Sequence, residues 1–427
     1  MFNREEYNKR IEWYKEARFG LFLHFGVYAI PARGEWLRSD EQMSIEDYQP
    51  FVDEFDPDDC DLNEWAKCAK QAGMKYAVLT AKHHDGYCLF DTKLTDYKSD
   101  RDFVKEFLEA FRKVGIKVGL YYSLLDWHHE DFPHYQDRYH PMRNNEAYKG
   151  KVHDFDRYLD YMHGQIKELC TQYGQLDIMW FDFSYNEMTA QKWRAQELVE
   201  MVRQYQPNII LDNRLEVSGE GFGSLVTDEP TDYSGDFVSP EQIIPPYGIL
   251  DHQGRPVMWE ACITMNDHWG YHSLDHNYKQ PKTIIHKLVE CVSKNGNMIL
   301  NVGPNARGRF PKESIQILKE IGMWMDDYGQ SIYGCGSSNL AKPDNGRLTQ
   351  KGKTLYYHIT EMSIGGIPLY GLNKEEIQSI RLLSDGSEVQ IMDLWTVKNY
   401  PDIVFVNFEG KNKLPNEIDT VLEIKLK

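Results

Sequence analysis

The chain has 427 residues, of which 41% are hydrophobic and 27% are charged, and its formal net charge is -18. This composition is typical of a folded globular protein and excludes a disordered or fibrous chain. The acidic balance, with no run of Lys and Arg, argues against a nucleic-acid partner, because such binding needs a basic surface that displaces counterions. The length suits a barrel of about 300 residues with a smaller second domain.

The beginning of the chain, MFNREEYNKR, lacks the basic start, apolar stretch and small-residue cleavage site of a secretory signal. We therefore expect a cytoplasmic protein. The longest weakly polar stretch, residues 19–32, is about half the length of a membrane-spanning helix and includes His24. No membrane span is expected. Seven scattered cysteines without a CxxC pair predict neither a disulfide framework nor a zinc ribbon.

Three segments repeat one pattern: an amphipathic helix, a glycine just past its end, and a short apolar run rich in β-branched and aromatic residues. They span residues 62–86, residues 101–127, and a helix ending near Tyr173 followed by QLDIMWFDF. The 3.6-residue stripe indicates a helix, the glycine suits the left-handed position after it, and the apolar run indicates a strand buried on both faces. Repetition of this unit predicts a parallel sheet covered by helices.

Four more apolar segments extend this sheet, at residues 18–26, 208–214, 259–264 and 297–304. A total of about seven or eight strands favours a barrel over an open sheet, so the predicted fold class is α/β with an irregular (β/α)8 TIM-like barrel. Beyond about Cys335, short segments with period-two patterning, such as TLYYHIT and TVLEIKL, predict a C-terminal antiparallel β-sandwich. We place the barrel at residues 1–338 and the sandwich at residues 339–427.

Polar side chains lie at or near the ends of the predicted strands, where a barrel carries its active site. They are His24, His83, His84, Asp85, Tyr121, Tyr122, Asp182 and Arg214. Asp182 follows an apolar strand, where an unpaired carboxylate is costly to bury. A helix cap or a buried ion pair is the ordinary explanation of such a residue, but the polar neighbours at other strand ends favour a pocket that positions a carboxylate.

One chemistry that uses a carboxylate in such a pocket is glycoside hydrolysis, which requires a second carboxyl group; in a retaining enzyme it lies roughly 5 Å from the first. The loops between residues 214 and 260 must supply it, and the residue types alone do not choose among the candidates. These are Glu216, Glu220, Asp228, Glu229, Asp232, Asp236, Glu241 and Glu260.

The sequence lacks the motifs that other enzyme chemistries require. His83 and His84 are adjacent, so on a strand they point to opposite faces and cannot easily share one metal ion. The chain has no HExxH, GxSxG, GxGxxG or P-loop pattern, which argues against metal-dependent hydrolysis, acyl transfer and nucleotide chemistry. We expect no metal and no cofactor.

Several long motifs, in order, resemble the family 29 α-L-fucosidases. They are WYKEARFGLFLHFGVYAIP, KYAVLTAKHHDGYCLFDTKLTDY, GLYYSLLDW, WFDF, WEACITMNDHWGY and LVECVSKNGNMILNVGPNARGRFP, and the resemblance covers about residues 11–335. It implies that Asp182, two residues after Trp180, is the nucleophile. It also implies that the sugar is bound by His24, Glu35, Trp36, His83, His84, Tyr121 and Arg214, with Trp180 and Trp269 lining the pocket.

The segment GDFVSPEQ at 235–242 resembles the acid/base segment of one branch of that family, which selects Glu241, with Glu229 and Glu260 in reserve. No segment resembles the Pro-Pro-Glu acid/base of the branch restricted to branched fucosides, so the broader-specificity branch is expected.

The implied activity is retaining exo-hydrolysis of terminal α-L-fucose from glycans or fucosides. The alternatives are a retaining enzyme for a related sugar such as an α-galactoside, or an inactive carbohydrate-binding protein. The sequence does not determine the linkage preference or whether the protein forms a homo-oligomer. For the second domain, a role in supporting the barrel is favoured over glycan binding.

Overall fold

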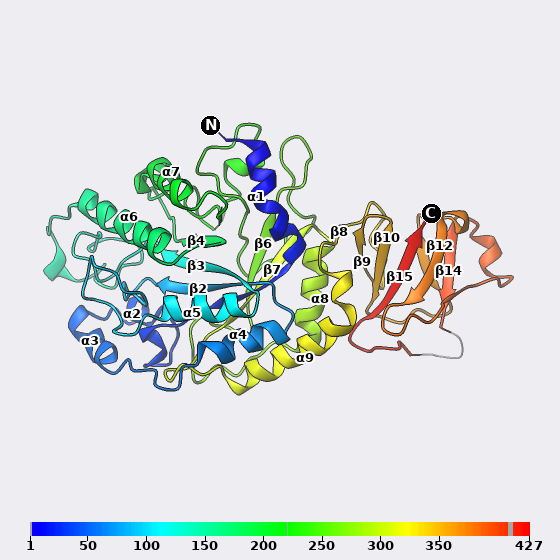
Figure 1. Cartoon of the computed structure of the whole chain (residues 1–427), viewed down its shortest axis with the longest axis horizontal. Helices are drawn as coiled ribbons and strands as arrows, with labels where there is room; N and C mark the ends of the chain where they lie inside the picture. Colours follow the sequence, from blue (N-terminus) through cyan, green and yellow to red (C-terminus); the bar gives the residue numbers. More distant parts are fainter. Residues whose placement is uncertain (1, 220, 409–412) are drawn as a thin grey trace.

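The computed structural model describes residues 2–219, 221–408 and 413–427. Figure 1 shows a larger part made of helices and a parallel sheet, and a smaller part made of β-strands that contains the C-terminus. Within those described ranges, no helix combines the length and apolar character that crossing a bilayer requires.

The centre of the larger part is a seven-stranded sheet in which every neighbouring pair of strands is parallel, with the order β5-β4-β3-β2-β1-β7-β6. Each of the seven strands overlaps a segment that the sequence predicted, and β7 begins one residue earlier than expected. Their bounds are β1 Phe19–Leu23, β2 Tyr76–Lys82, β3 Lys117–Ser123, β4 Ile178–Asp182, β5 Ile210–Leu211, β6 Trp259–Thr264 and β7 Gly296–Val302.

Helices alternate with these strands along the chain and lie around the sheet (Figure 1). In α5 the buried face consists largely of the predicted apolar stripe, and the side chain of Asp102 caps the first turn by accepting from the amide of Lys105 at 2.8 Å. Gly73 follows α4 with φ of 82°, which glycine adopts without strain. The helices are α1 Arg4–Ala17, α2 Leu37–Asp40, α3 Ile45–Asp53, α4 Leu62–Gln71, α5 Phe103–Lys113, α6 Phe155–Gln172, α7 Ala195–Tyr205, α8 Pro281–Val292 and α9 Lys312–Tyr328.

An irregular segment connects the two edge strands of the sheet. Phe237 forms an isolated parallel bridge with Asp212, directly after β5, and Val238 forms one with Trp259 of β6. Glu241, further along the same segment, is bridged to β6 as well. The larger part is therefore a half-barrel of TIM-like type with seven regular strands, and a short bridged segment stands where the sequence left room for an eighth.

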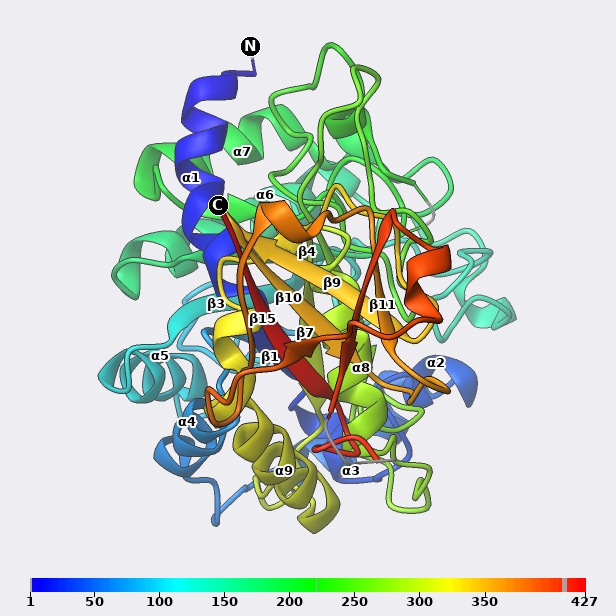
Figure 2. The same cartoon turned by 90° about the vertical axis from the view of Figure 1, so that its right-hand side faces the viewer.

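The smaller part contains two antiparallel sheets, as the period-two patterning predicted. One has the order β12-β15-β10-β9-β8 and the other the order β11-β14-β13. Side chains of both sheets form one apolar cluster, which includes Leu355, Leu369 and Val404. Figure 2 looks onto this part, with β9, β10 and β15 side by side. The bounds are β8 Gly336–Ser337, β9 Gly346–Lys351, β10 Thr354–Ile359, β11 Ile367–Tyr370, β12 Ile377–Leu382, β13 Gln390–Ile391, β14 Ile403–Asn407 and β15 Thr420–Leu426.

Hydrogen bonds tie the smaller part to α8 and to the chain after α9. The Thr349 hydroxyl donates to the carbonyl of Ser331 at 2.7 Å, and Arg347 forms an ion pair with Glu290 of α8 at 2.7 Å. The domain boundary at residue 338 stays a prediction. Strand β8, just before it, already pairs with β9.

Candidate active site

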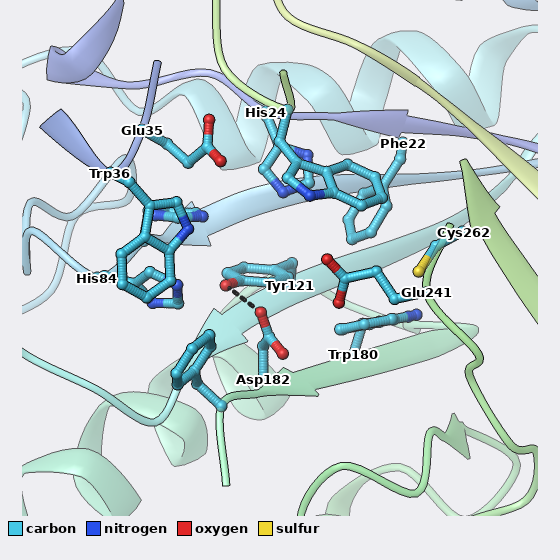
Figure 3. Close-up of a pocket in the computed structure, with 13 residues that line it drawn as sticks. Phe22, His24, Glu35, Trp36, His84, Tyr121, Trp180, Asp182, Glu241 and Cys262 are labelled. Carbon is cyan, nitrogen blue, oxygen red and sulfur yellow. Dashed lines mark hydrogen bonds between the residues drawn. The ribbon is translucent and has the colours of Figure 1, made fainter. Parts of the chain in front are cut away.

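A pocket lies at the C-terminal ends of the parallel strands, and it collects side chains from distant parts of the sequence (Figure 3). About 360 Å³ of space not filled by atoms lies within it, part of it open to solvent. The lining residues are Phe22, His24, Glu35, Trp36, His83, His84, Tyr121, Trp180, Asp182, Phe183, Glu241, Cys262 and Trp269.

One guanidinium group holds two carboxylates at the edge of this pocket. Arg214 donates from Nη1 to Oδ1 of Asp182 at 3.0 Å and from Nη2 to Oε2 of Glu241 at 3.0 Å. Its own position is set by Ser239, whose hydroxyl and carbonyl oxygens each accept from it at 3.0 Å. Because both ion pairs share one planar fork, the two carboxylates are kept in a fixed relation.

The two carboxylates differ in environment. The side chain of Asp182 is 14% exposed and also accepts a hydrogen bond from Tyr121 at 2.8 Å, whereas that of Glu241 is 42% exposed. Burial raises the pKa of Asp182 to about 6; the charge of Arg214 opposes this rise, and the charge of Glu241 adds to it. A carboxylate must be ionised to act as a nucleophile, so activity that depends on Asp182 falls as the pH drops through this value.

Replacing Arg214 with methionine removes the cation that lowers the pKa of Asp182. We expect the acidic limb of the kcat/KM profile to move to higher pH by about 1–3 units, the usual effect of an opposite charge at this distance. Arg214→Lys is the matched control, because it keeps the charge and loses the fork; its acidic limb should stay closer to that of the wild type although kcat/KM falls. An unchanged limb in Arg214→Met would contradict this role.

The hydrogen bonds of His24 set its tautomer. Asn301 donates from its amide nitrogen to the carbonyl of Trp269 at 2.7 Å, so its amide oxygen faces Nδ1 of His24, also at 2.7 Å. That oxygen only accepts, and therefore Nδ1 of His24 carries the proton and Nε2 is an acceptor. Burial lowers the pKa of His24 to about 3, which keeps the ring neutral.

The same reasoning applies to His84. The hydroxyl of Ser123 donates to the carbonyl of Leu125 at 3.0 Å and thus accepts from Nδ1 of His84 at 2.7 Å. The neighbouring His83 stacks on the ring of Tyr121, with 5.3 Å between the centroids, and its Nδ1 has no hydrogen-bond partner within the described residues. Burial lowers the pKa values of His83 and His84, so both rings are neutral and can hydrogen-bond an uncharged polar ligand.

Glu35 and the aromatic rings complete the wall. Glu35 accepts from the amide of Gly270 at 2.7 Å, and burial raises its pKa. The ring centroid of Phe22 lies 4.6 Å from that of His24 and 6.0 Å from that of Trp269. The rings of Phe22 and Trp269 make this side of the pocket apolar. The structure thus brings all eleven predicted site residues to one place: ten line the pocket, and Arg214 lies against both carboxylates.

Sequence reasoning missed three lining residues. Phe22 lies on β1, two positions before His24, which directly follows the strand, so the alternation of a strand could have placed both on one face. Phe183 directly follows Asp182 and has φ of 82°, a strained conformation for a bulky residue that no sequence pattern announces. Cys262 lies on β6, where its burial resembles that of an ordinary core cysteine.

Among the described candidates for the second carboxyl group, Glu241 alone lines the pocket. Glu229 lines a different surface hollow with Arg4, and Asp236 is paired with Arg10 and Arg203. Burial raises the pKa of Glu260 to about 7, a value that suits an acid/base, but its side chain does not line the pocket. Glu220 lies outside the described residues.

Within the ranges that the structure describes, no group of three or more His, Cys, Asp and Glu side chains is arranged to hold a metal ion. All seven cysteines are free.

A TIM-like sheet that brings a pair of arginine-bound carboxylates to a polar and aromatic pocket fits a glycoside hydrolase, whose chemistry needs two carboxyl groups. Comparisons with known proteins define this class further. The sequence matches the family Alpha-L-fucosidase over residues 2–330. The chain belongs to this family, glycoside hydrolase family 29.

Individual relatives agree with this assignment. The chain is 29% identical to an alpha-L-fucosidase of Dictyostelium discoideum, over 75% of this chain and 71% of that protein. It is similar to the structure of alpha-L-fucosidase isoenzyme 1 from Paenibacillus thiaminolyticus, with 54% identity, a TM-score of 0.96 and coverage of 99% and 100% of the two chains. The chain is also similar to the structure of a Bacteroides thetaiotaomicron alpha-L-fucosidase, a trapped covalent intermediate with 2-fluoro-fucosyl fluoride. The sequence identity is 26%, the TM-score is 0.83, and the match covers 98% of this chain and 96% of that one.

Proposed function

We propose that the protein is a retaining exo-α-L-fucosidase that forms a covalent glycosyl-enzyme on Asp182, with Glu241 as general acid/base. The observation that carries this proposal is the single Arg214 guanidinium that binds both carboxylates, each at 3.0 Å. The buried carboxylate has a restrained position suited to attack on a carbon atom. The more exposed carboxylate can exchange protons with a leaving group and with water.

In the first step Asp182 attacks the anomeric carbon of fucose, and the bond from that carbon to the leaving-group oxygen breaks while Glu241 donates its proton to that oxygen. In the second step Glu241 removes a proton from water, and the water oxygen replaces Asp182 at the same carbon. Two inversions at one carbon give net retention. The covalent intermediate trapped in the Bacteroides thetaiotaomicron relative supports this two-step course.

The side chains that line the pocket support fucose as the sugar that it binds. The acceptor nitrogens of His24 and His84 can each accept a hydrogen bond from a sugar hydroxyl group, and the buried Glu35 can bind another hydroxyl group. The apolar side formed by Phe22 and Trp269 suits the C6 methyl group that distinguishes fucose from galactose. Together these contacts orient the ring for attack.

A second hollow next to the pocket can hold the leaving group of the substrate. This hollow shares Phe183 and Glu241 with the pocket and is also lined by Arg138, Tyr139 and Asn186. Because Glu241 lines both, a glycosidic oxygen beside its carboxyl group would direct the rest of the substrate into this hollow. A pocket for one sugar next to an open hollow is suited to exo-hydrolysis of terminal fucose.

The fit of the C6 methyl group is tested by comparing 4-nitrophenyl α-L-fucoside with 4-nitrophenyl α-L-galactoside, which differs by one hydroxyl group at C6. We expect kcat/KM to favour the fucoside by roughly 10- to 200-fold, the range for one small group in an apolar pocket. A preference for the galactoside would refute the sugar assignment. Turnover of neither, in a protein that still binds fucose, would favour the carbohydrate-binding alternative.

A further inference from the structure

Glu260 is a buried carboxylate that the mechanism above does not use. It lies on β6, is 1% exposed, and forms no ion pair with a described Lys or Arg. Its Oε2 accepts hydrogen bonds from the hydroxyl groups of Tyr14 and Tyr76, and its Oε1 accepts one from Nε1 of Trp180 at 3.3 Å. Burying a carboxyl group without a cationic partner is costly unless hydrogen bonds satisfy it, and here three neutral donors do so.

The surrounding residues are arranged to make these contacts. Tyr14 comes from α1, Tyr76 from β2 and Trp180 from β4, so three separate elements converge on one carboxyl group. Gly20 of β1 provides space for the ring of Tyr76, because a Cβ atom at Gly20 would lie 2.2 Å from that ring. The contacts are therefore part of the packing of the sheet and its first helix.

Trp180 connects this buried carboxyl group with the catalytic pair. Its ring is stacked on that of Tyr121, with 5.8 Å between centroids, and the guanidinium carbon of Arg214 lies 5.0 Å from its centre. Tyr121 and Arg214 are the side chains that bind Asp182. Figure 3 shows Trp180, Tyr121, Asp182 and Glu241 around the same pocket, with the hydrogen bond from Tyr121 to Asp182 drawn as a dashed line.

We propose that Glu260 is a positioning residue, which fixes the plane of Trp180 and thereby keeps Tyr121 and Arg214 in place around the catalytic carboxylates. The proposal rests on the proposed function of Asp182 and Glu241. The indole N–H is the only polar group of the Trp180 side chain, so its hydrogen bond to Glu260 favours one orientation of the ring. A ring that turns would displace both groups that hold Asp182, and displacements of about 1 Å near a reacting centre reduce rates by about 100-fold.

The test compares Glu260→Gln, Glu260→Leu and Trp180→Phe in 4-nitrophenyl α-L-fucoside hydrolysis, with and without azide. Gln keeps an oxygen that can accept from Trp180, whereas Leu does not. We expect Glu260→Leu to lower kcat/KM by roughly 10- to 100-fold, Glu260→Gln to lose clearly less, and azide to restore neither. In the double variant of Glu260→Leu and Trp180→Phe, the combined loss should be smaller than the product of the single losses, because each change removes the same hydrogen bond.

Two results would overturn the proposal. Azide rescue of Glu260→Leu with an α-fucosyl azide product would make Glu260 the acid/base, and fully multiplicative losses in the double variant would separate Glu260 from Trp180. If Glu260→Leu does not fold, Glu260→Met replaces it in the single and double variants, because Met is unbranched like Glu and offers no oxygen to the indole N–H. Wild-type activity and azide rescue of Asp182→Ala report on the proposed function separately, so multiplicative losses in an active enzyme would refute this inference alone.

Discussion

Asp182→Ala should lower kcat for 4-nitrophenyl α-L-fucoside by roughly 10⁴-fold or more, the scale expected when a nucleophile is removed. Azide should restore turnover, because a small anion can occupy the space that the carboxylate leaves and attack the anomeric carbon directly. One displacement inverts that carbon, so the product should be β-fucosyl azide. The measurements are kcat with and without azide and the configuration of the product by NMR.

The matched control is Asp177→Ala. Asp177 precedes β4 at the end opposite to Asp182, where it accepts from the amide of Val118 at 3.0 Å and pairs with Lys117 at 2.7 Å. Its loss should lower the unfolding temperature and leave kcat close to that of the wild type. Equal inactivation of both variants would mean that the effect of Asp182→Ala comes from the strand rather than from a nucleophile.

Glu241→Ala should lower kcat/KM by about 10²- to 10⁴-fold for fucosides of ordinary alcohols, which need a proton on the departing oxygen. The loss should be smaller for the 4-nitrophenyl fucoside, because its leaving group departs readily as an anion. Hydrolysis of the glycosyl-enzyme then becomes slow, since no base activates water. Azide attacks without a base and should accelerate turnover, giving α-fucosyl azide by two inversions.

Glu229→Ala is the control for this variant, because Glu229 was in reserve for the same role and lies in another hollow. It should keep nearly wild-type kcat/KM for every leaving group. If Glu229→Ala shows the leaving-group dependence and azide rescue while Glu241→Ala does not, the acid/base assignment is wrong.

The regular elements of the fold could be predicted because local patterns determine them. The apolar stripe of 101–115 requires a helix, and unbroken apolar runs such as QLDIMWFDF require buried strands. The segment at 237–241 could not be recognised in this way. It is joined to Asp212 and to β6 only by isolated bridges, which depend on tertiary contacts rather than on a repeating pattern.

The site was predictable where strand ends determine it and unpredictable where long loops do. His24, Tyr121 and Asp182 follow from the rule that parallel strands present their carboxyl ends together. Glu241 follows only from the family resemblance, because no local signal distinguishes it from other acidic residues between 214 and 260. The hydrogen bonds that fix the tautomers of His24 and His84 join segments far apart in the chain and required the structure.

The covalent step is the central claim, and labelling with 2-fluoro-fucosyl fluoride tests it most directly. The fluorine slows both steps, and the reactive fluoride leaving group compensates in the first, so a glycosyl-enzyme accumulates. Mass spectrometry of the intact protein and of its peptides should show one fluoro-fucosyl group per chain, attached to Asp182 and absent from the Asp182→Ala variant. A label on another carboxylate, or an active enzyme that releases β-fucose and carries no label, would contradict the account.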